Sequence, residues 1–256
     1  MKEISTYISE KLKIDKSVNK YTYHPENQEE LIFIIGKLIK ARGRDANLND
    51  IDVSGIDWMR KLFVTFGSDI RNIDISKWDV SNVRNMNQMF EGCNEFNCDL
   101  SKWDVGNVVE MKNMFHLCYK FDSDLSDWDV HKVQSMEGMF DRCESFNCDL
   151  SKWDVSSVYS MKYMFHECKE FEGIGLDKWK TNSLGYTERM FAYCKKFNAD
   201  IINRNTDILY EMQYMFNKCE NFNQDLNKWK LPRCQNMFDA FDGCKSLKKL
   251  PDWYHE

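Results

Sequence analysis

Residues 96–105 read Phe-Asn-Cys-Asp-Leu-Ser-Lys-Trp-Asp-Val, and the same ten residues return at 146–155. A phenylalanine outside this stretch recurs at steps of 25 or 26 residues, followed three residues later by a cysteine. These phenylalanines are Phe90, Phe115, Phe140, Phe165, Phe191, Phe216 and Phe241. With a degenerate copy at 52–63, about eight copies result. A fixed period of this length is typical of a solenoid, in which each copy, called a rung below, stacks on the one before.

Each rung divides into two halves with different apolar spacing. Val83, Met86, Met89 and Cys93 recur every three or four residues, which predicts a short helix. Residues 96–103 predict a short extended strand followed by a turn. Stacked rungs would pair these strands in parallel, with the helices on the opposite side. The fold class expected is therefore α/β, a solenoid of about eight 25-residue turns.

The residues before the repeats predict a cap for the solenoid. Ile4, Tyr7, Ile8 and Leu12 lie on one face of an amphipathic helix, within a segment and linker at 1–24. A capping helix is expected within 25–50, with its N-cap at Asn27-Gln28-Glu29-Glu30 and its end near Gly43. The solenoid domain is assigned to residues 51–256, and the helix at 25–50 would cover its open end.

Composition excludes several classes of function. The net charge is −6, and no Lys/Arg cluster stands apart from acidic neighbours, so nucleic acid is not expected as a partner. No run of 18 apolar residues predicts a membrane span. The N-terminus carries charges at positions 2, 3, 10 and 11 and lacks the apolar core of a signal peptide. The expectation is a cytoplasmic protein that does not contact a membrane.

The repeated polar residues have structural interpretations. Seven of the ten cysteines occupy one repeat position, which favours a buried column of reduced thiols over a metal or redox site. Stacked aspartates could form a calcium ladder, but they are expected to accept backbone N–H groups at turns. The first aspartate column is Asp79, Asp104, Asp129 and Asp154, and the second is Asp99, Asp124, Asp149, Asp200 and Asp225.

Other columns are weighed in the same way. The asparagines Asn97, Asn147, Asn198 and Asn223 are expected to satisfy turn backbone, and the tryptophans to lie in the core rather than form a glycan platform. His116 and His166 share one repeat position and are predicted to face solvent. No nucleophile with a fixed base is indicated. We therefore expect no enzyme activity, no cofactor, no metal and no catalytic residue.

The pattern Phe-Asn-x-Asp-Leu-Ser-Lys-Trp-Asp-Val-x-x-Val-x-x-Met-x-x-Met-Phe-x-x-Cys, together with the last turn at 240–251, resembles the BspA-like leucine-rich repeat family and its 25-residue bacterial subfamily. The match spans residues 52–254. The resemblance implies a leucine-rich-repeat-like solenoid used for protein contact or adhesion, without enzyme activity. Many members are surface proteins, whereas this chain has no recognisable export signal.

A second resemblance concerns residues 1–10. Met1-Lys2-x-Ile4-x-x-Tyr7-Ile8-x-Glu10 is similar to the capsid-targeting peptides of internal head proteins from tailed phages. The resemblance implies a phage or prophage protein that is packaged in the head, or that binds and inhibits a host enzyme.

A partner site is expected where rungs differ from one another. Tyrosines, which are common in protein interfaces, concentrate in rungs five to seven. They are Tyr159, Tyr163, Tyr186, Tyr193, Tyr210 and Tyr214. The leading hypothesis is a non-catalytic scaffold that binds a protein partner, with a homodimer through the C-terminal end of the solenoid as a further expectation. The alternatives are the phage protein and a surface adhesin or calcium- or glycan-binding module.

Overall fold

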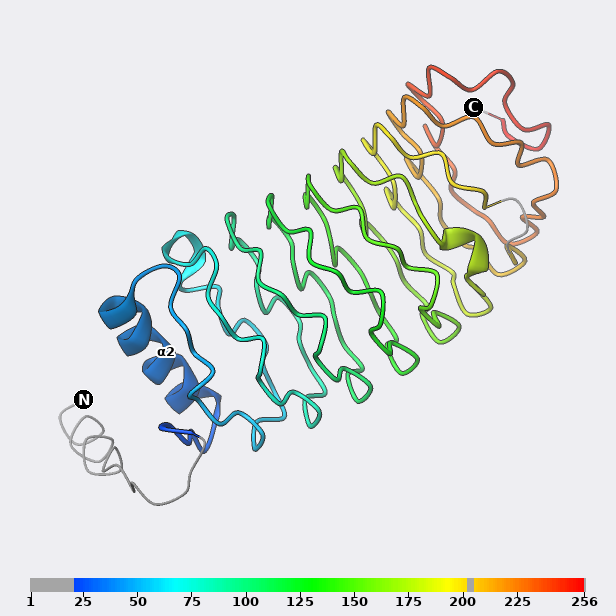
Figure 1. The fold of residues 1–256 in the computed structure, drawn as a ribbon. Coiled ribbons are helices and arrows are strands. Elements are labelled where there is room, and N and C mark those ends of the chain that lie inside the picture. The colour runs from blue at the N-terminus through cyan, green and yellow to red at the C-terminus, as the bar shows by residue number, and fades with distance from the viewer. Residues whose placement is uncertain (1–20, 202–204, 256) are drawn as a thin grey trace.

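The computed structural model describes residues 21–201 and 205–255. The chain winds into an elongated solenoid that runs from helix α2 at one end to the C-terminus at the other (Figure 1). In the described part, the helices are α2 (Gln28–Arg42) and two short 3-10 helices, η1 (Gly67–Asp69) and η2 (Leu176–Lys178). The predicted helix around Ile4 to Leu12 lies outside the described residues.

One residue from each rung joins a continuous row of parallel β-bridges. The row is Trp58, Asn85, Glu110, Ser135, Ser160, Tyr186, Glu211 and Asn236, and these residues number the rungs 1 to 8 below. Two further bridges, Tyr23 with Ile51 and Asn47 with Asp74, extend the stack toward the N-terminus. The stacked repeat solenoid is confirmed.

Helix α2 begins and ends where its sequence predicts. The Asn27 side chain accepts a hydrogen bond from the Glu30 N–H at 3.0 Å, and the Gly43 N–H donates to the Ile39 carbonyl at 2.8 Å. Its buried residues are Leu31, Ile34, Ile35, Leu38 and Ile39, all of which join the hydrophobic core of the solenoid. Since α2 lies across the first turns, the N-terminal end of the core is covered (Figure 1).

The helix predicted in each rung is wrong. Gln88 and Gly92 have φ angles of 60° and 76°, which no α-helix accommodates. The same left-handed pair recurs as Asn113 and Leu117, Gly138 and Arg142, Tyr163 and Glu167, Arg189 and Tyr193, Tyr214 and Lys218, and Asp239 and Gly243. The spacing of three and four residues therefore belongs to successive tight turns rather than to a helix.

Hydrogen bonds between rungs take the place of helical ones. The N–H groups of Met86, Gln88 and Phe90 donate to carbonyls of rung 3 at 2.8–2.9 Å, while the Met89 N–H closes a turn on the Met86 carbonyl. The turn-rich half thus carries the β-bridges. The strand predicted over residues 96–103 is also wrong, because no strand forms anywhere in the described residues and this half is a series of turns. Stacking offers each backbone group a partner in the next rung, which apolar spacing alone does not reveal.

Two stacked columns of phenylalanine rings fill the core. Phe90, Phe115 and Phe140 stack at centroid distances of 5.4 and 5.7 Å, and Phe96 and Phe121 at 6.0 Å. The cysteine column lies beside them. The thiols of Cys118 and Cys143 donate to the Phe90 and Phe115 carbonyls at 3.0 and 3.1 Å. Each thiol therefore ties its rung to the preceding one.

Candidate functional site

Both aspartate columns close turns, as the sequence predicts. Carboxylate oxygens of Asp99, Asp124 and Asp149 accept the N–H of the serine two residues ahead at 2.8–2.9 Å. Asp79, Asp104, Asp129 and Asp154 do the same at 3.0–3.3 Å. The hydrogen bond from the Ser101 N–H lowers the pKa of Asp99. Across 21–201 and 205–255, no three His, Cys, Asp or Glu side chains are grouped to hold a metal ion.

The tryptophan column is core, also as predicted. Trp103, Trp128 and Trp153 are buried, and their indole N–H groups donate to carbonyls of the preceding rung at 2.9–3.1 Å. These rings are closed to a sugar. Trp58 in rung 1 lies outside this column and is 51% exposed.

The asparagine column links the rungs, confirming its structural interpretation. The side-chain oxygen of Asn97 accepts the Asp122 N–H, that of Asp122 accepts the Asn147 N–H, and that of Asn147 accepts the Glu172 N–H, all at 3.0 Å. Asn198 and Asn223 repeat the contact farther along.

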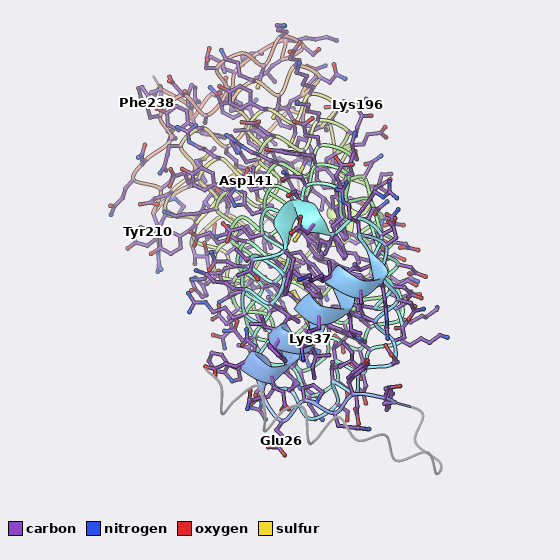
Figure 2. All side chains as sticks on the ribbon, turned by 90° about the vertical axis from the view of Figure 1, so that its left-hand side faces the viewer. Glu26, Lys37, Asp141, Lys196, Tyr210 and Phe238 are labelled. Carbon is purple, nitrogen blue, oxygen red and sulfur yellow. The ribbon has the colours of Figure 1, made fainter. Side chains whose placement is uncertain are left out.

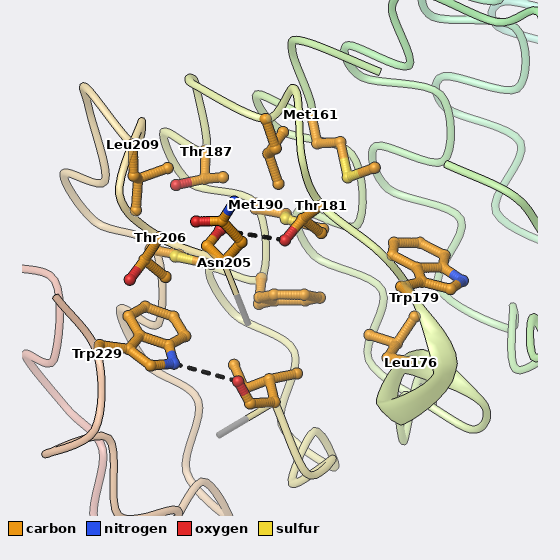
Figure 3. A pocket seen from close by; sticks show the side chains of 14 residues that line it. Met161, Leu176, Trp179, Thr181, Thr187, Met190, Asn205, Thr206, Leu209 and Trp229 are labelled. Atoms are coloured by element: carbon orange, nitrogen blue, oxygen red, sulfur yellow. Dashed lines mark hydrogen bonds between the residues drawn. The ribbon is translucent and has the colours of Figure 1, made fainter. Parts of the chain in front are cut away.

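A cavity of about 40 Å³ opens where two repeat columns are interrupted. The tryptophan column skips one rung between Trp179 and Trp229, both of which line the cavity (Figure 3). Thr187 stands where the other rungs have methionine, as in Met161 and Met212. Ligand pockets typically enclose about 300–1,000 Å³, so this cavity is a packing defect rather than a metabolite site.

The histidines correct the prediction that they face solvent. His166 is only 8% exposed, and its Nδ1 lies 2.8 Å from an Asp141 carboxylate oxygen. His116 is partly buried, with its two ring nitrogens 3.2 Å from Glu91 and 3.3 Å from Asp141. Stacking places histidines and acids alternately in one column, Glu91, His116, Asp141 and His166, which offsets the repulsion of like charges. They form a structural ladder.

Four of the six tyrosines singled out in the sequence are exposed. Tyr159, Tyr186, Tyr193 and Tyr210 are 42, 37, 39 and 40% exposed, while Tyr163 and Tyr214 are partly buried among them. All six lie in the bridge-bearing half of rungs 5 to 7. Figure 2 shows Tyr210 and Phe238 on one side of the solenoid and Lys196 on the other. We call the six residues the tyrosine face.

Neighbouring rungs hold these rings in place. Tyr186 and Tyr210 stack at 6.3 Å, with the Lys162 ammonium 5.2 Å from the Tyr186 ring. That ammonium also lies 2.5 Å from a Glu211 carboxylate oxygen, and this contact helps raise the Lys162 pKa, against the opposing effect of burial. The face is therefore partly ordered before any partner arrives.

The two partly buried tyrosines share a cation. The Arg189 guanidinium lies 4.1 Å from the Tyr214 ring and 6.0 Å from the Tyr163 ring, and the Tyr163 hydroxyl donates to Glu188 at 2.9 Å. Tyr193 packs edge-on against His166, which in turn packs against Tyr163. The structure thus joins Tyr163, Tyr193 and Tyr214 in one cluster and Tyr186 with Tyr210 in another.

Sequence reasoning missed the charged residues between the rings. Lys162, Glu188, Arg189 and Glu211 reach the tyrosines only across rungs, so the signal lies in the 25-residue register rather than in local spacing. Phe238 in rung 8, 61% exposed, was also missed. It packs edge-on against Tyr214 at 5.5 Å.

No described helix has both the length and the apolar character needed to span a bilayer. No curated protein matches the sequence. Among solved structures, one described as the crystal structure of a TLR13–ssRNA13 complex aligns with 88% of this chain and 38% of its own, at 12% identity and a TM-score of 0.31. The chain thus spans well under half the length of that protein. A family described as "Mycoplasma protein of unknown function, DUF285", which is associated with BspA-like repeat proteins, matches residues 58–175 and 160–255. These matches cover most of the sequence and nearly all of its rungs, and the chain belongs to this family.

Proposed function

We propose that this protein is a non-catalytic scaffold that binds a partner protein through the tyrosine face of rungs 5 to 7. The observation that carries the proposal is the run of exposed tyrosines, Tyr159, Tyr186, Tyr193 and Tyr210, across three consecutive rungs. Within the DUF285 family, we assign the repeat to the 25-residue BspA-like subfamily that its pattern resembles.

The tyrosine face differs from the equivalent surface of the earlier rungs. At the position before the bridge, rungs 2 to 4 carry Arg84, Val109 and Gln134, whereas rungs 5 and 7 carry Tyr159 and Tyr210. Tyrosine provides a large contact area with few rotatable bonds, so its ordering costs little entropy on binding. The stacked pair of Tyr186 and Tyr210 reduces that cost further.

Several features favour a binding role over catalysis. Burial raises the pKa of the Cys93 thiol to about 12, and that of Cys143 well above its usual range, which suppresses the thiolate that nucleophilic chemistry needs. His166 is held between Asp141 and neighbouring rings.

The same reasoning ranks the alternatives below a protein partner. Aspartate oxygens that a calcium ladder would use accept turn N–H groups, as at Asp99, and the tryptophans of the column, such as Trp128, are buried. The hypothesis of a phage-packaged protein rests on residues 1–10, outside the described residues.

The test compares two triple variants in a pull-down from the native host, quantified by mass spectrometry. Tyr159→Ser, Tyr186→Ser and Tyr210→Ser together should abolish capture of a protein that the unaltered chain retains. Arg84→Ser, Val109→Ser and Gln134→Ser change the corresponding half of rungs 2 to 4 and should preserve capture. Equal retention by both variants, each folded by circular dichroism, would show that the tyrosine face is not the binding surface.

A further inference from the structure

The two ends of the solenoid differ. At the N-terminal end, α2 covers the core. At the other end, Tyr254 packs edge-on against Phe241 at 5.0 Å and closes the column of phenylalanine rings. The turn-rich half of rung 8 has no such cover, and Phe238 and Leu250 beside it are 61 and 41% exposed. This edge, residues 235–243, is called the rung-8 edge.

The rung-8 edge has a defined hydrogen-bonding pattern. In rung 2, the N–H groups of Met86, Gln88 and Phe90 donate to the carbonyls of Glu110, Lys112 and Met114 in rung 3, and the Arg84 carbonyl accepts the Val109 N–H. The equivalent donors in rung 8 are Met237, Asp239 and Phe241, and the equivalent acceptor is the Gln235 carbonyl. None of these four groups has a hydrogen-bond partner among residues 21–201 and 205–255.

A groove runs beside these donors. It encloses about 480 Å³ and is lined by aromatic and aliphatic side chains and by two carboxylates: Phe238, Phe241, Leu250 and Tyr254, with Asp239 and Asp242. Asp242 is paired with Lys218 at 2.6 Å, whereas the Asp239 carboxylate has no ion-pair partner in the described part of the chain. The lining includes no lysine or arginine.

We propose that the rung-8 edge binds an extended segment of a partner protein by adding it to the stack as a further rung. The segment presents carbonyls at every second residue to Met237, Asp239 and Phe241, and places an aliphatic or aromatic side chain in the groove. A lysine or arginine beside that side chain meets Asp239. Backbone pairing supplies the affinity and the groove the selectivity, as in other cases where a peptide extends a sheet edge.

The donor pattern selects this occupant over a second copy of the chain. Two copies that met symmetrically through their rung-8 edges would place N–H donors against N–H donors, which cannot pair. A head-to-tail arrangement would require the first turns of the next copy, and α2 covers those. A separate extended segment has neither restriction.

The probe is a fluorescein-labelled peptide with the sequence of residues 109–118, the segment that covers the same edge of rung 2 and carries a lysine, two methionines and a phenylalanine. Fluorescence polarisation against the full chain, under reducing conditions, should show saturable binding that a scrambled peptide lacks. At saturation, hydrogen exchange of the amides of Met237, Asp239 and Phe241 should slow by about tenfold or more.

Three variants locate the site. Phe238→Asp should weaken peptide binding roughly tenfold or more, because it places a charge beside the groove. Trp58→Asp, a matched control at an exposed aromatic residue of rung 1, should leave binding unchanged. The triple tyrosine variant should also leave it unchanged, so failure of this proposal and failure of the proposed function are distinguishable.

The proposal is overturned if the scrambled peptide binds equally well, or if Phe238→Asp and Trp58→Asp have equal effects. It is also overturned if exchange at Met237, Asp239 and Phe241 is unchanged by the peptide. A dimer in solution whose rung-8 amides are protected before peptide is added would assign the edge to a second copy instead.

Discussion

The buried thiols should make this protein unusually sensitive to alkali. Eight of its cysteines are buried, and burial raises the pKa of Cys93 to about 12 and that of Cys98 to about 11. In the unfolded chain, a thiol would have a value near 9.0. Between these values the unfolded chain loses protons that the folded chain keeps. The free energy of unfolding is therefore undiminished below about pH 9 and falls as the pH rises above it.

The size of the effect follows from the number of thiols. At pH 10, ionisation stabilises each unfolded-state thiol by about 1.4 kcal/mol, while a thiol with a pKa near 12 stays protonated in the folded state. Eight such groups together amount to roughly 11 kcal/mol, which is comparable to the whole stability of a typical domain, about 5–15 kcal/mol. We expect cooperative unfolding between about pH 9 and 11.

Urea unfolding followed by circular dichroism from pH 7 to 10.5, with a phosphine reductant to prevent oxidation, measures this dependence. Cys143→Ser removes one ionisable group and keeps a donor for the Phe115 carbonyl, so the slope of unfolding free energy against pH should become shallower by about 1.4 kcal/mol per unit. Cys234→Ser, at a partly exposed position, should change the slope less. A free energy of unfolding that stays constant from pH 8 to 10 would refute the reasoning.

Two further substitutions test individual contacts. Thr187→Met should fill the cavity of about 40 Å³ and raise stability by up to about 1 kcal/mol, seen as a rise in Tm of roughly 2–4 °C, because the Glu211 carbonyl keeps the Thr187 N–H as a donor. Thr187→Val, which leaves the cavity open, is the control, and an equal rise in both would contradict the packing argument. Asn147→Ala should cost about 0.5–1.5 kcal/mol in urea unfolding, because the Glu172 N–H loses its acceptor. Asn147→Asp should be tolerated, since Asp122 already makes the same contact in the preceding rung, and equal losses in both variants would count against the ladder.

The parts of the fold that the sequence predicts are those fixed by the repeat itself. Buried thiols, core tryptophans and turn-closing aspartates follow from one fact, that equivalent residues of successive rungs lie side by side. Cys143, Trp128 and Asp124 each have the structural role expected for them. The N-cap at Asn27 was also predictable, because it depends only on local backbone donors.

The conformation of the rung was not predictable from its apolar spacing. The left-handed positions hold Gln88, Asn113, Tyr163 and Asp239 in different rungs, so glycine marks only some of them. Their conformation is held by hydrogen bonds to the next rung, such as that from the Gln88 N–H to the Lys112 carbonyl. A pattern read along the chain reports which residues are buried, but here the backbone is set by pairing across a separation of 24 residues.

The candidate surfaces show the same division. The tyrosines of rungs 5 to 7 stand out in the sequence because they break the repeat, whereas the charges that hold them, such as Lys162 beside Tyr186, become neighbours only through the stacking register. The rung-8 edge has no signal of its own, because Met237 to Phe241 resemble every earlier rung. What distinguishes it is the lack of a following rung among the described residues. The same donors that stabilise the interior of the solenoid therefore become a binding surface at its end, and a partner that matches them needs only to reproduce a contact the protein already makes between its own rungs.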